Sequence, residues 1–299
     1  MKSNFTPLSE PIPIKDHTWP EDTLPLVHTR TMTFMHEEYI EECIEGIINQ
    51  KTTFPVQVLI HDDASTDRTA EIIRQYELTY PNLIKAYYQP KNTYSQKNKN
   101  ELRAEFMAWR IGRYEAMCEG DDYWIYPLKL QKQVDYLESH PECSLCFHDA
   151  VTINQLTGKE INKFNIPKKE KIAAKDIILK AWFIPTASIV FRMKHLPEYG
   201  SYPDWYIKSK AGDIALQIYL AKFGYFHALS GKLSVYRYYA NSSLTLSNKG
   251  NDPIPGLIQY GRLISRANAK HFNYKYIFCV AVRWARILAS IVKHKLKPK

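Results

Sequence analysis

The chain has 299 residues, and its hydrophobic and charged fractions, 45% and 24%, are those of an ordinary globular protein. This length allows one large α/β domain or two modest ones, and no run of residues is long and apolar enough to span a bilayer. The net charge of +9 predicts a polyanionic neighbour, which is a phosphate compound, an anionic membrane face or a nucleic acid.

The first half of the chain alternates predicted strands and helices. After an extended arm over residues 1–23, the pattern predicts a weak strand over 24–32, a helix over 39–50, a strand over 56–60, a helix over 68–80 and a strand over 83–88. This alternation indicates a parallel sheet with helices on its faces. A polar, lysine-rich loop over 89–99 and a helix over 101–110 precede the next strand, over 114–118.

The second half continues the α/β pattern. It predicts a helix after Pro127, a strand over 144–151, a helix over 173–181, a strand over 186–191, a loop with exposed aromatic side chains over 202–205, a helix over 213–223 and strands over 225–229 and 233–238. The five cysteines are scattered, and Cys143-x-x-Cys146 has no second pair for a zinc site. We therefore expect free thiols and, since residues 1–17 lack a signal-peptide pattern, a cytoplasmic protein.

Two acidic clusters follow predicted strands. Asp62 and Asp63 end the strand over 56–60, and Glu119, Asp121 and Asp122 follow the strand over 114–118. Because ligands bind outside the carboxyl ends of parallel strands, both clusters are expected at one binding edge. Crowded carboxylates favour a hard cation such as Mg²⁺ or Mn²⁺ between them. The alternatives are a solvated acidic turn and helix capping by the aspartates.

Four segments in order resemble family 2 glycosyltransferases, the inverting enzymes of the GT-A fold. They are residues 33–44, which begin with TFMHEEYI, residues 62–69 (DDASTDRT), residues 119–124 (EGDDYW), and Gly212-Asp213 at the start of a predicted helix. The similarity runs from about residue 27 to residue 245. It implies a GT-A domain over 24–245, with a mostly parallel, Rossmann-like sheet flanked by helices, between the arm (1–23) and a C-terminal helical extension (246–299).

The resemblance implies a nucleoside-diphosphate sugar donor, a UDP-sugar above all. The expected nucleotide-binding residues are Thr33, Phe34, Glu37, Asp63, Asp121 and Arg237. Among them, Phe34 would stack on the base, and the Asp63 carboxylate would accept the imide N–H of the base. The family usually has Tyr-Asn at the Phe34-Met35 positions, so a phenol contact is lost here. An ordinary surface salt bridge is the alternative role for Arg237.

The resemblance also implies a metal and a general base. Asp122 is expected to bind Mn²⁺ or Mg²⁺, with Asp121 on the metal or the ribose, and the metal would stabilise the leaving nucleoside diphosphate. Asp213 is expected to deprotonate the acceptor hydroxyl, in its ionised form at a helix N-terminus. The alternative for Asp213 is a helix N-cap. A single displacement predicts inversion at the anomeric carbon.

Four further residues are expected near the sugar or the acceptor. They are Trp124, His148, Thr186 and Ser188. For Trp124 the alternative is a core position, and for His148 it is a structural histidine with satisfied hydrogen bonds.

The C-terminal segment forms a basic amphipathic helix in this prediction. Over residues 276–296 one face carries Ile277, Val280, Trp284, Ile287, Leu288 and Ile291, and arginines and lysines supply positive charge. This helix either lies on an anionic membrane surface, which places the protein peripherally on the inner face of the cell membrane, or packs on the catalytic domain.

The expected function is therefore hexosyl transfer to a hydroxyl of a glycan or lipid-linked acceptor, in surface polysaccharide biosynthesis. Two rivals stay open: a nucleotidyl or phosphoryl transferase, which also uses paired carboxylates and Mg²⁺, and a catalytically degenerate sugar-nucleotide-binding module. The absence of a Gly-x-x-x-x-Gly-Lys motif disfavours a P-loop enzyme. No nucleic-acid partner is expected, since the positive charge forms no single stripe apart from the tail.

Overall fold

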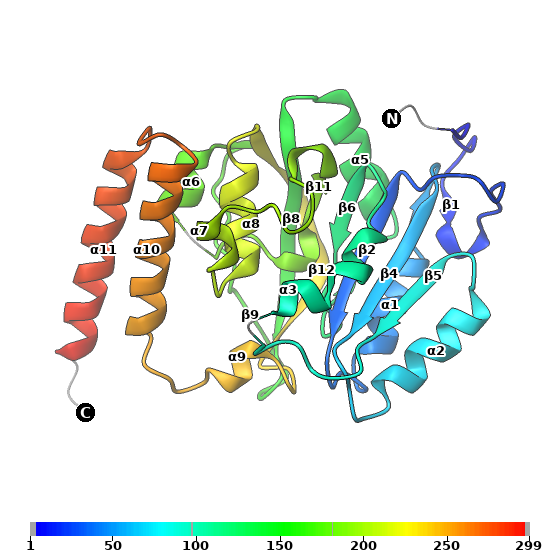
Figure 1. Cartoon of the computed structure of the whole chain (residues 1–299), viewed down its shortest axis with the longest axis horizontal. Helices are drawn as coiled ribbons and strands as arrows, with labels where there is room; N and C mark the ends of the chain where they lie inside the picture. Colours follow the sequence, from blue (N-terminus) through cyan, green and yellow to red (C-terminus); the bar gives the residue numbers. More distant parts are fainter. Residues whose placement is uncertain (1–3, 97, 181, 297–299) are drawn as a thin grey trace.

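The computed structural model of the chain describes residues 4–96, 98–180 and 182–296 (Figure 1). Its centre is a mixed, mostly parallel sheet with the strand order β10-β12-β8-β11-β6-β2-β4-β5. Four strands run parallel in the half that begins the chain: β2 (Val27–Thr33), β4 (Val56–Asp62), β5 (Ile84–Tyr88) and β6 (Tyr114–Met117). The predicted α/β class and the parallel arrangement of these strands are confirmed.

The other half of the sheet is mixed. The long strands β8 (Cys143–Asn154) and β12 (Tyr225–Tyr238) run parallel to each other, and β11 (Val190–Arg192) lies antiparallel between β8 and β6. Short antiparallel strands extend this half: β7 (Tyr123–Trp124), β9 (Lys159–Ile161) and β10 (Lys171–Ile172). A separate pair joins β1 (Ile12–Pro13) to β3 (Lys51–Thr52), so the N-terminal arm packs on the domain.

Helices cover both faces of the sheet, because its side chains alternate between two cores. Along β8, Cys146 belongs to a core that also contains residues of α1 (Ile40–Ile48), α2 (Thr69–Thr79) and α5 (Lys129–Ser139). The neighbouring Phe147 packs instead with α6 (Ala174–Leu179), α7 (Asp204–Ile207) and α8 (Gly212–Leu220). Short helices α3 (Lys99–Leu102), α4 (Ala104–Ala108) and α9 (Leu244–Ser247) lie in connections.

The C-terminal segment forms two antiparallel helices outside this layer, α10 (Ile254–Lys270) and α11 (Ile277–Lys295) (Figure 1). Tyr260 and Ile264 of α10 and Val280 and Ile287 of α11 are buried in the same core as α6 and α8. Of the face of α11 that the sequence indicated, Val280, Trp284, Ile287 and Ile291 pack on the domain, whereas Ile277 and Leu288 are exposed. Within the described residues, no helix combines the length and the apolar character that crossing a membrane requires.

Several local predictions were wrong. Residues 186–188 form a 3-10 turn before β11, and residues 225–238 form one strand, bent near Gly231, whose φ of 101° suits glycine. Trp205 was expected to be exposed, but it is buried in α7 against α10. The helix expected over 101–110 is replaced by α3 and α4. The prediction over 173–181 ends on residue 181, which lies outside the described residues.

Candidate active site

The carboxyl ends of β2, β4 and β6 meet at one edge of the sheet, as the sequence predicted. Backbone hydrogen bonds hold the three ends together: Gly120 N donates to Met32 O (3.0 Å), and Asp63 N donates to Thr33 O (3.0 Å). Gly120 is required at this point, since a Cβ there would lie 2.6 Å from Thr33 Oγ1 and 2.9 Å from His36 Nδ1. Both acidic clusters are thus anchored to the end of β2.

The acidic turn after β6 contains carboxylate oxygens without protein partners. The Asp121 side chain accepts no hydrogen bond from any described residue. Asp122 is buried; its Oδ1 accepts from Arg237 N (2.9 Å), whereas its Oδ2 has no partner within the described part of the chain. Burial, followed by the neighbouring charge of Asp121, raises the pKa of Asp122 well above its ordinary value. Such a carboxylate is stabilised in its ionised form by a cation.

The charge of the Asp213 carboxylate acts on this acidic turn. Burial raises the pKa of Glu119 to about 7 against the opposing charge of Arg30, and the charges of Asp121 and Asp213 add to the rise. Asp213 occupies the first turn of α8, and the N-cap position belongs to Ala211, so the capping alternative does not describe it. Burial also raises the pKa of Asp213, although the backbone N–H of Ile214 opposes this. The expected stabilisation of the ionised form at the helix start is therefore outweighed.

Arg237 is a buried structural cation at the centre of the site. Its NH1 donates to Asp121 O (2.8 Å), its NH2 pairs with Glu42 of α1, and its guanidinium lies 4.4 Å from the Tyr123 ring centre. These contacts fix the acidic turn against α1 and β12. The alternative of a surface salt bridge does not hold, because the Arg237 side chain is 7% exposed.

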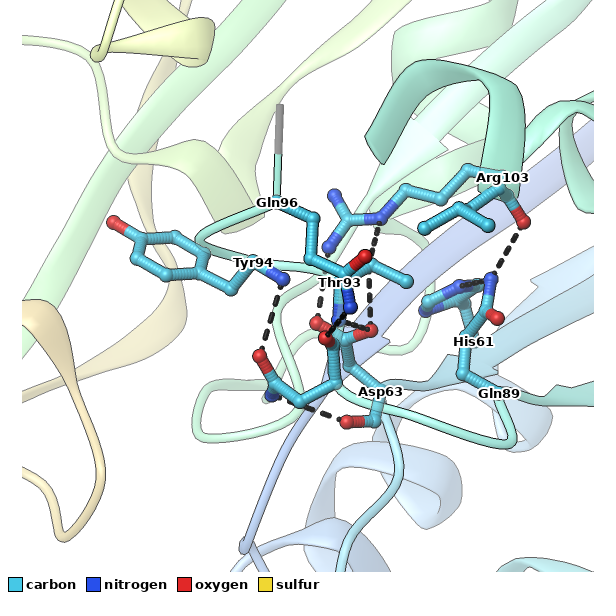
Figure 2. A network of polar contacts seen from close by, with 9 residues as sticks. His61, Asp63, Gln89, Thr93, Tyr94, Gln96 and Arg103 are labelled. Atoms are coloured by element: carbon cyan, nitrogen blue, oxygen red, sulfur yellow. Dashed lines mark hydrogen bonds and ion pairs between the residues drawn. The ribbon is translucent and has the colours of Figure 1, made fainter. Parts of the chain in front are cut away.

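Asp63 binds a loop of the protein itself (Figure 2). Its Oδ1 accepts from Thr93 N (2.9 Å) and Thr93 Oγ1 (2.6 Å), and its Oδ2 pairs with Arg103 NH2 (3.1 Å). Asn92 Nδ2 also donates to Asp63 O (3.2 Å). The loop over 89–99 is therefore anchored on β4. The sequence pattern does not predict these partners, which lie 30 and 40 residues from Asp63.

The other aspartates of residues 62–67 accept hydrogen bonds from backbone N–H groups of the turn before α2 and of its first residue. Asp62 accepts from Ser65 N (3.1 Å), and Asp67 Oδ1 accepts from Thr69 N (3.0 Å) at the start of α2. The Glu37 carboxylate accepts from Arg68 N (2.9 Å), so it holds the β2–α1 loop to the same helix start. Phe34 is 37% exposed on that loop and is available for stacking.

Three of the four residues expected near the sugar or acceptor are buried. Trp124 is in the core, with Nε1 donating to Ala187 O (2.7 Å). Ser188 is fully buried and donates to Pro185 O (2.6 Å), and His148 is fully buried with its pKa well below the ordinary value because of burial. None of these three side chains can line an open pocket. Thr186 alone of the set is partly exposed.

The residues present fit a divalent cation held jointly by protein and substrate. Among the described residues there is no group of three histidine, cysteine, aspartate or glutamate side chains able to hold a metal ion. Asp121 and Asp122 nevertheless supply carboxylate oxygens that lack protein partners. Mg²⁺ is commonly bound by one or two carboxylates plus substrate phosphate oxygens, and this donor set matches that pattern.

Comparison with known proteins identifies a family. The family model for glycosyl transferase family 2 matches residues 31–200, more than half of the chain. The uncharacterized protein Rv1520 of Mycobacterium tuberculosis is 37% identical over 195 residues, which cover 62% of this chain and 54% of the relative. The putative teichuronic acid biosynthesis glycosyltransferase TuaG of Bacillus subtilis is 29% identical over 141 residues, 47% of this chain and 52% of that protein. The chain thus matches about half the length of these relatives.

Solved structures of glycosyltransferases share the fold. Residues 1–349 of TarS from S. aureus, in complex with UDP-GlcNAc, superpose with a TM-score of 0.58 at 16% identity, covering 81% of this chain and 66% of TarS 1–349. The mannosyltransferase PcManGT from Pyrobaculum calidifontis, in complex with GDP-Man and Mn²⁺, gives a TM-score of 0.54 at 16% identity, covering 97% and 79%. The expected GT-A fold is confirmed.

Proposed function

The chain belongs to glycosyl transferase family 2, and from this premise we propose that it is a metal-dependent inverting hexosyltransferase. Its donor is a nucleoside-diphosphate sugar, and its acceptor is a hydroxyl of a glycan or lipid-linked oligosaccharide in surface polysaccharide biosynthesis. One observation carries the proposal: at the carboxyl edge of the sheet, Asp121 and Asp122 have carboxylate oxygens without protein partners, and the charges of Asp121 and Asp213 both act on the intervening Glu119.

The acidic turn accounts for diphosphate binding. Asp121 and Asp122 would hold Mn²⁺ or Mg²⁺, which when bound neutralises charge on the leaving diphosphate. Arg237 keeps both carboxylates in place through Asp121 O and Asp122 Oδ1. Its role is then to position the turn, since its NH1 and NH2 groups already bind Asp121 O and Glu42. The complex of PcManGT with Mn²⁺ is consistent with this assignment.

Asp213 is the candidate general base. The raised pKa of its carboxyl group makes the ionised form a stronger proton acceptor, closer in pKa to the working pH. A single base acting on the acceptor hydroxyl, with the diphosphate leaving from the opposite side of the sugar, produces inversion. Glu119, whose pKa burial raises to about 7, borders this position and is not required as a second base.

The surroundings of Asp63 favour a uracil or thymine nucleotide. A carboxylate has about four acceptor positions, and Thr93 and Arg103 occupy three of them. One position remains on Oδ2, beside the Arg103 guanidinium. The imide edge of uracil or thymine presents one N–H next to a carbonyl oxygen, and so needs one acceptor and one donor. Guanine presents two neighbouring donor groups and would need a second acceptor. Phe34 provides the stacking face.

Membrane association is part of the proposal, through an outward face of α11 that shares only Leu288 with the face the sequence indicated. The outward face carries large exposed side chains at helical spacing: Phe278 (84% exposed), Val282 (45%), Leu288 (56%), Val292 (55%) and Leu296 (76%). Arg286, Lys293 and Lys295 flank this outward face. Equal positive charges would repel two copies of it, whereas an anionic lipid surface satisfies both the apolar and the basic side chains.

Vesicle co-sedimentation tests this face. Wild-type protein should bind anionic phosphatidylglycerol vesicles and should not bind neutral phosphatidylcholine vesicles. The double substitution Phe278→Ser/Val292→Ser should abolish binding to the phosphatidylglycerol vesicles. Leu78→Ser is the matched control, because Leu78 is 81% exposed on α2. A wild-type protein that ignores anionic vesicles refutes the membrane role, and a dimer broken by the double substitution would identify a second copy as the partner.

The enzymatic proposal is tested by nucleotide binding and release. Wild-type protein, Asp122→Ala and Asp213→Asn are offered a panel of sugar nucleotides with Mn²⁺, with Mg²⁺ or with EDTA. We expect metal-dependent binding of one uridine or thymidine donor, lost in Asp122→Ala and kept in Asp213→Asn, and transfer to acceptor lost in both. Near-normal turnover by Asp213→Asn would remove its assignment as the base, and metal-independent binding would remove that of Asp122.

A further inference from the structure

A second concave site lies between α7 and α10. This cavity has a volume of about 520 Å³, and none of the donor, metal or base residues discussed above lines it. Its wall is formed by the end of α7, the segment that leads to α8, and one face of α10. Four cationic side chains contribute to it: Lys208, Lys210, Arg262 and Arg266.

Three of these cations lack a counter-charge. Lys208 pairs with Asp204 (2.7 Å), but Lys210, Arg262 and Arg266 form no ion pair with any residue that the structure describes. Arg262 and Arg266 are one helical turn apart, and like charges at this spacing repel. No carboxylate lines the cavity. An anion bound among these side chains would relieve the repulsion.

The cavity also has an apolar part and an unsatisfied donor. Ile254 and Ile258 lie on the same face of α10 as the two arginines, and Ile254 is about 12 Å along the helix axis from Arg262. Trp205 is buried in the wall, and its Nε1–H has no hydrogen-bond partner among the described residues. The cavity is therefore cationic at one end and apolar at the other.

The position of the cavity relates it to the acceptor. Lys210 precedes Asp213 by three residues, so their Cα atoms are at most about 11 Å apart. The donor diphosphate has its own site at the acidic turn, where the carboxylates of Asp121 and Asp122 would repel an anion that arrived without a metal. An anion in the cavity thus belongs to the other substrate, whose hydroxyl faces Asp213.

We propose that this cavity binds a phosphate group of the acceptor, with Arg262, Arg266 and Lys210 as its cations. That the ligand belongs to the acceptor rests on the proposed function, whereas that the ligand group is a phosphate rests on the cavity alone. The apolar end favours a lipid-linked phosphate, in which the hydrocarbon chain begins beside the phosphate. A phosphate within a soluble glycan has the same anionic chemistry but no use for Ile254 and Ile258.

Calorimetric titration of the full chain with inorganic pyrophosphate and with geranyl diphosphate tests the proposal. EDTA is present, so that the acidic turn repels both probes. Arg262→Ala/Arg266→Ala should weaken binding of both by about tenfold, as expected for two partly screened ion pairs. Lys168→Ala/Lys175→Ala removes the same charge from exposed positions outside the cavity and should change affinity less than about twofold.

The outcomes separate the sources of the ligand and the two proposals. Tighter binding of geranyl diphosphate, lost in Ile258→Ser, supports the lipid-linked source, whereas equal affinity for the two probes supports a glycan phosphate. No binding at millimolar concentration, or equal losses in the two charge variants, overturns the cavity assignment. Mn²⁺-dependent binding of UDP-sugars is measured separately. If wild-type protein does not bind them, the proposed function is refuted, but pyrophosphate binding at the cavity still supports an anion site there.

Discussion

Replacing Gly120 by alanine should damage both stability and donor binding. The new Cβ would lie 2.6 Å from Thr33 Oγ1, 2.7 Å from Thr33 Cβ and 2.9 Å from His36 Nδ1. Thr33 and His36 are buried, and the bond from Gly120 N to Met32 O holds the backbone close. Overpacking of this kind costs about 2 kcal/mol, which corresponds to a fall in Tm of about 4 °C for a chain of this size.

The same substitution displaces Asp121 and Asp122 relative to the ends of β2 and β4. Metal-dependent affinity for a uridine nucleotide should therefore fall by at least about tenfold, because a shift of about 1 Å is costly for positioned groups. Differential scanning fluorimetry and calorimetric titration measure the two effects. Gly256→Ala in α10 is the control, since nothing lies within 4 Å of its added Cβ, and its Tm should equal or exceed the wild-type value. A Gly120→Ala protein with wild-type Tm and affinity would refute the packing argument.

Three further predictions concern charges in the site. Burial raises the pKa of Glu119 to about 7, so the metal-free folded protein keeps a proton on Glu119 that the unfolded chain releases near its ordinary pKa. Tm should therefore fall as the pH rises from about 4.5 to 7, and Glu119→Gln should reduce this dependence of Tm on pH. An unchanged pH dependence in Glu119→Gln would exclude Glu119 as its source. Arg103→Met removes the partner of Asp63 and should weaken binding of uridine nucleotides by about tenfold in a calorimetric titration. Arg113→Met is the control, because Arg113 forms an exposed pair with Glu138, and it should leave binding unchanged. Equal effects of the two substitutions would exclude Arg103 from base recognition. Arg237→Met should lower the free energy of unfolding, measured in urea, by about 2 kcal/mol. This is less than the loss of a fully buried ion pair would cost, because Glu42, the partner of Arg237, is partly exposed. An unaltered urea midpoint would contradict the structural role of Arg237.

The sequence predicted the parts of the fold that depend on local patterns. Short β-branched runs such as 56–60 and apolar stripes such as that of α1 repeat at the periods of a strand and a helix. The carboxyl ends of those strands located both acidic clusters, because parallel strands bring them to one edge. The antiparallel insertion of β11 was missed, since direction depends on the path of the chain and not on the composition of three residues.

The candidate site was predictable in its residue types and less so in their partners. Asp63 was identified, but Arg103 and Thr93 were not, because a pair 40 residues apart has no periodic signal. Trp124 and His148 have residue types suited to sugar binding, and only the structure shows that both side chains are buried. In α11 the sequence predicted one apolar stripe, and only the packing against α10 and α6 shows that its Val280 and Ile287 face inward while its Leu288 stays exposed.

The bonds of Arg237 also determine when the site can be completed. Its hydrogen bonds to Asp121 and Asp122 span 116 and 115 residues, and its pair with Glu42 spans 195. Such separations give a high contact order, which makes this part of the fold slow to form. During synthesis the acidic turn leaves the ribosome long before β12, so a nascent chain carries its clustered carboxylates without their cation. The donor site therefore matures as one of the last events of folding, after both halves of the sheet have joined.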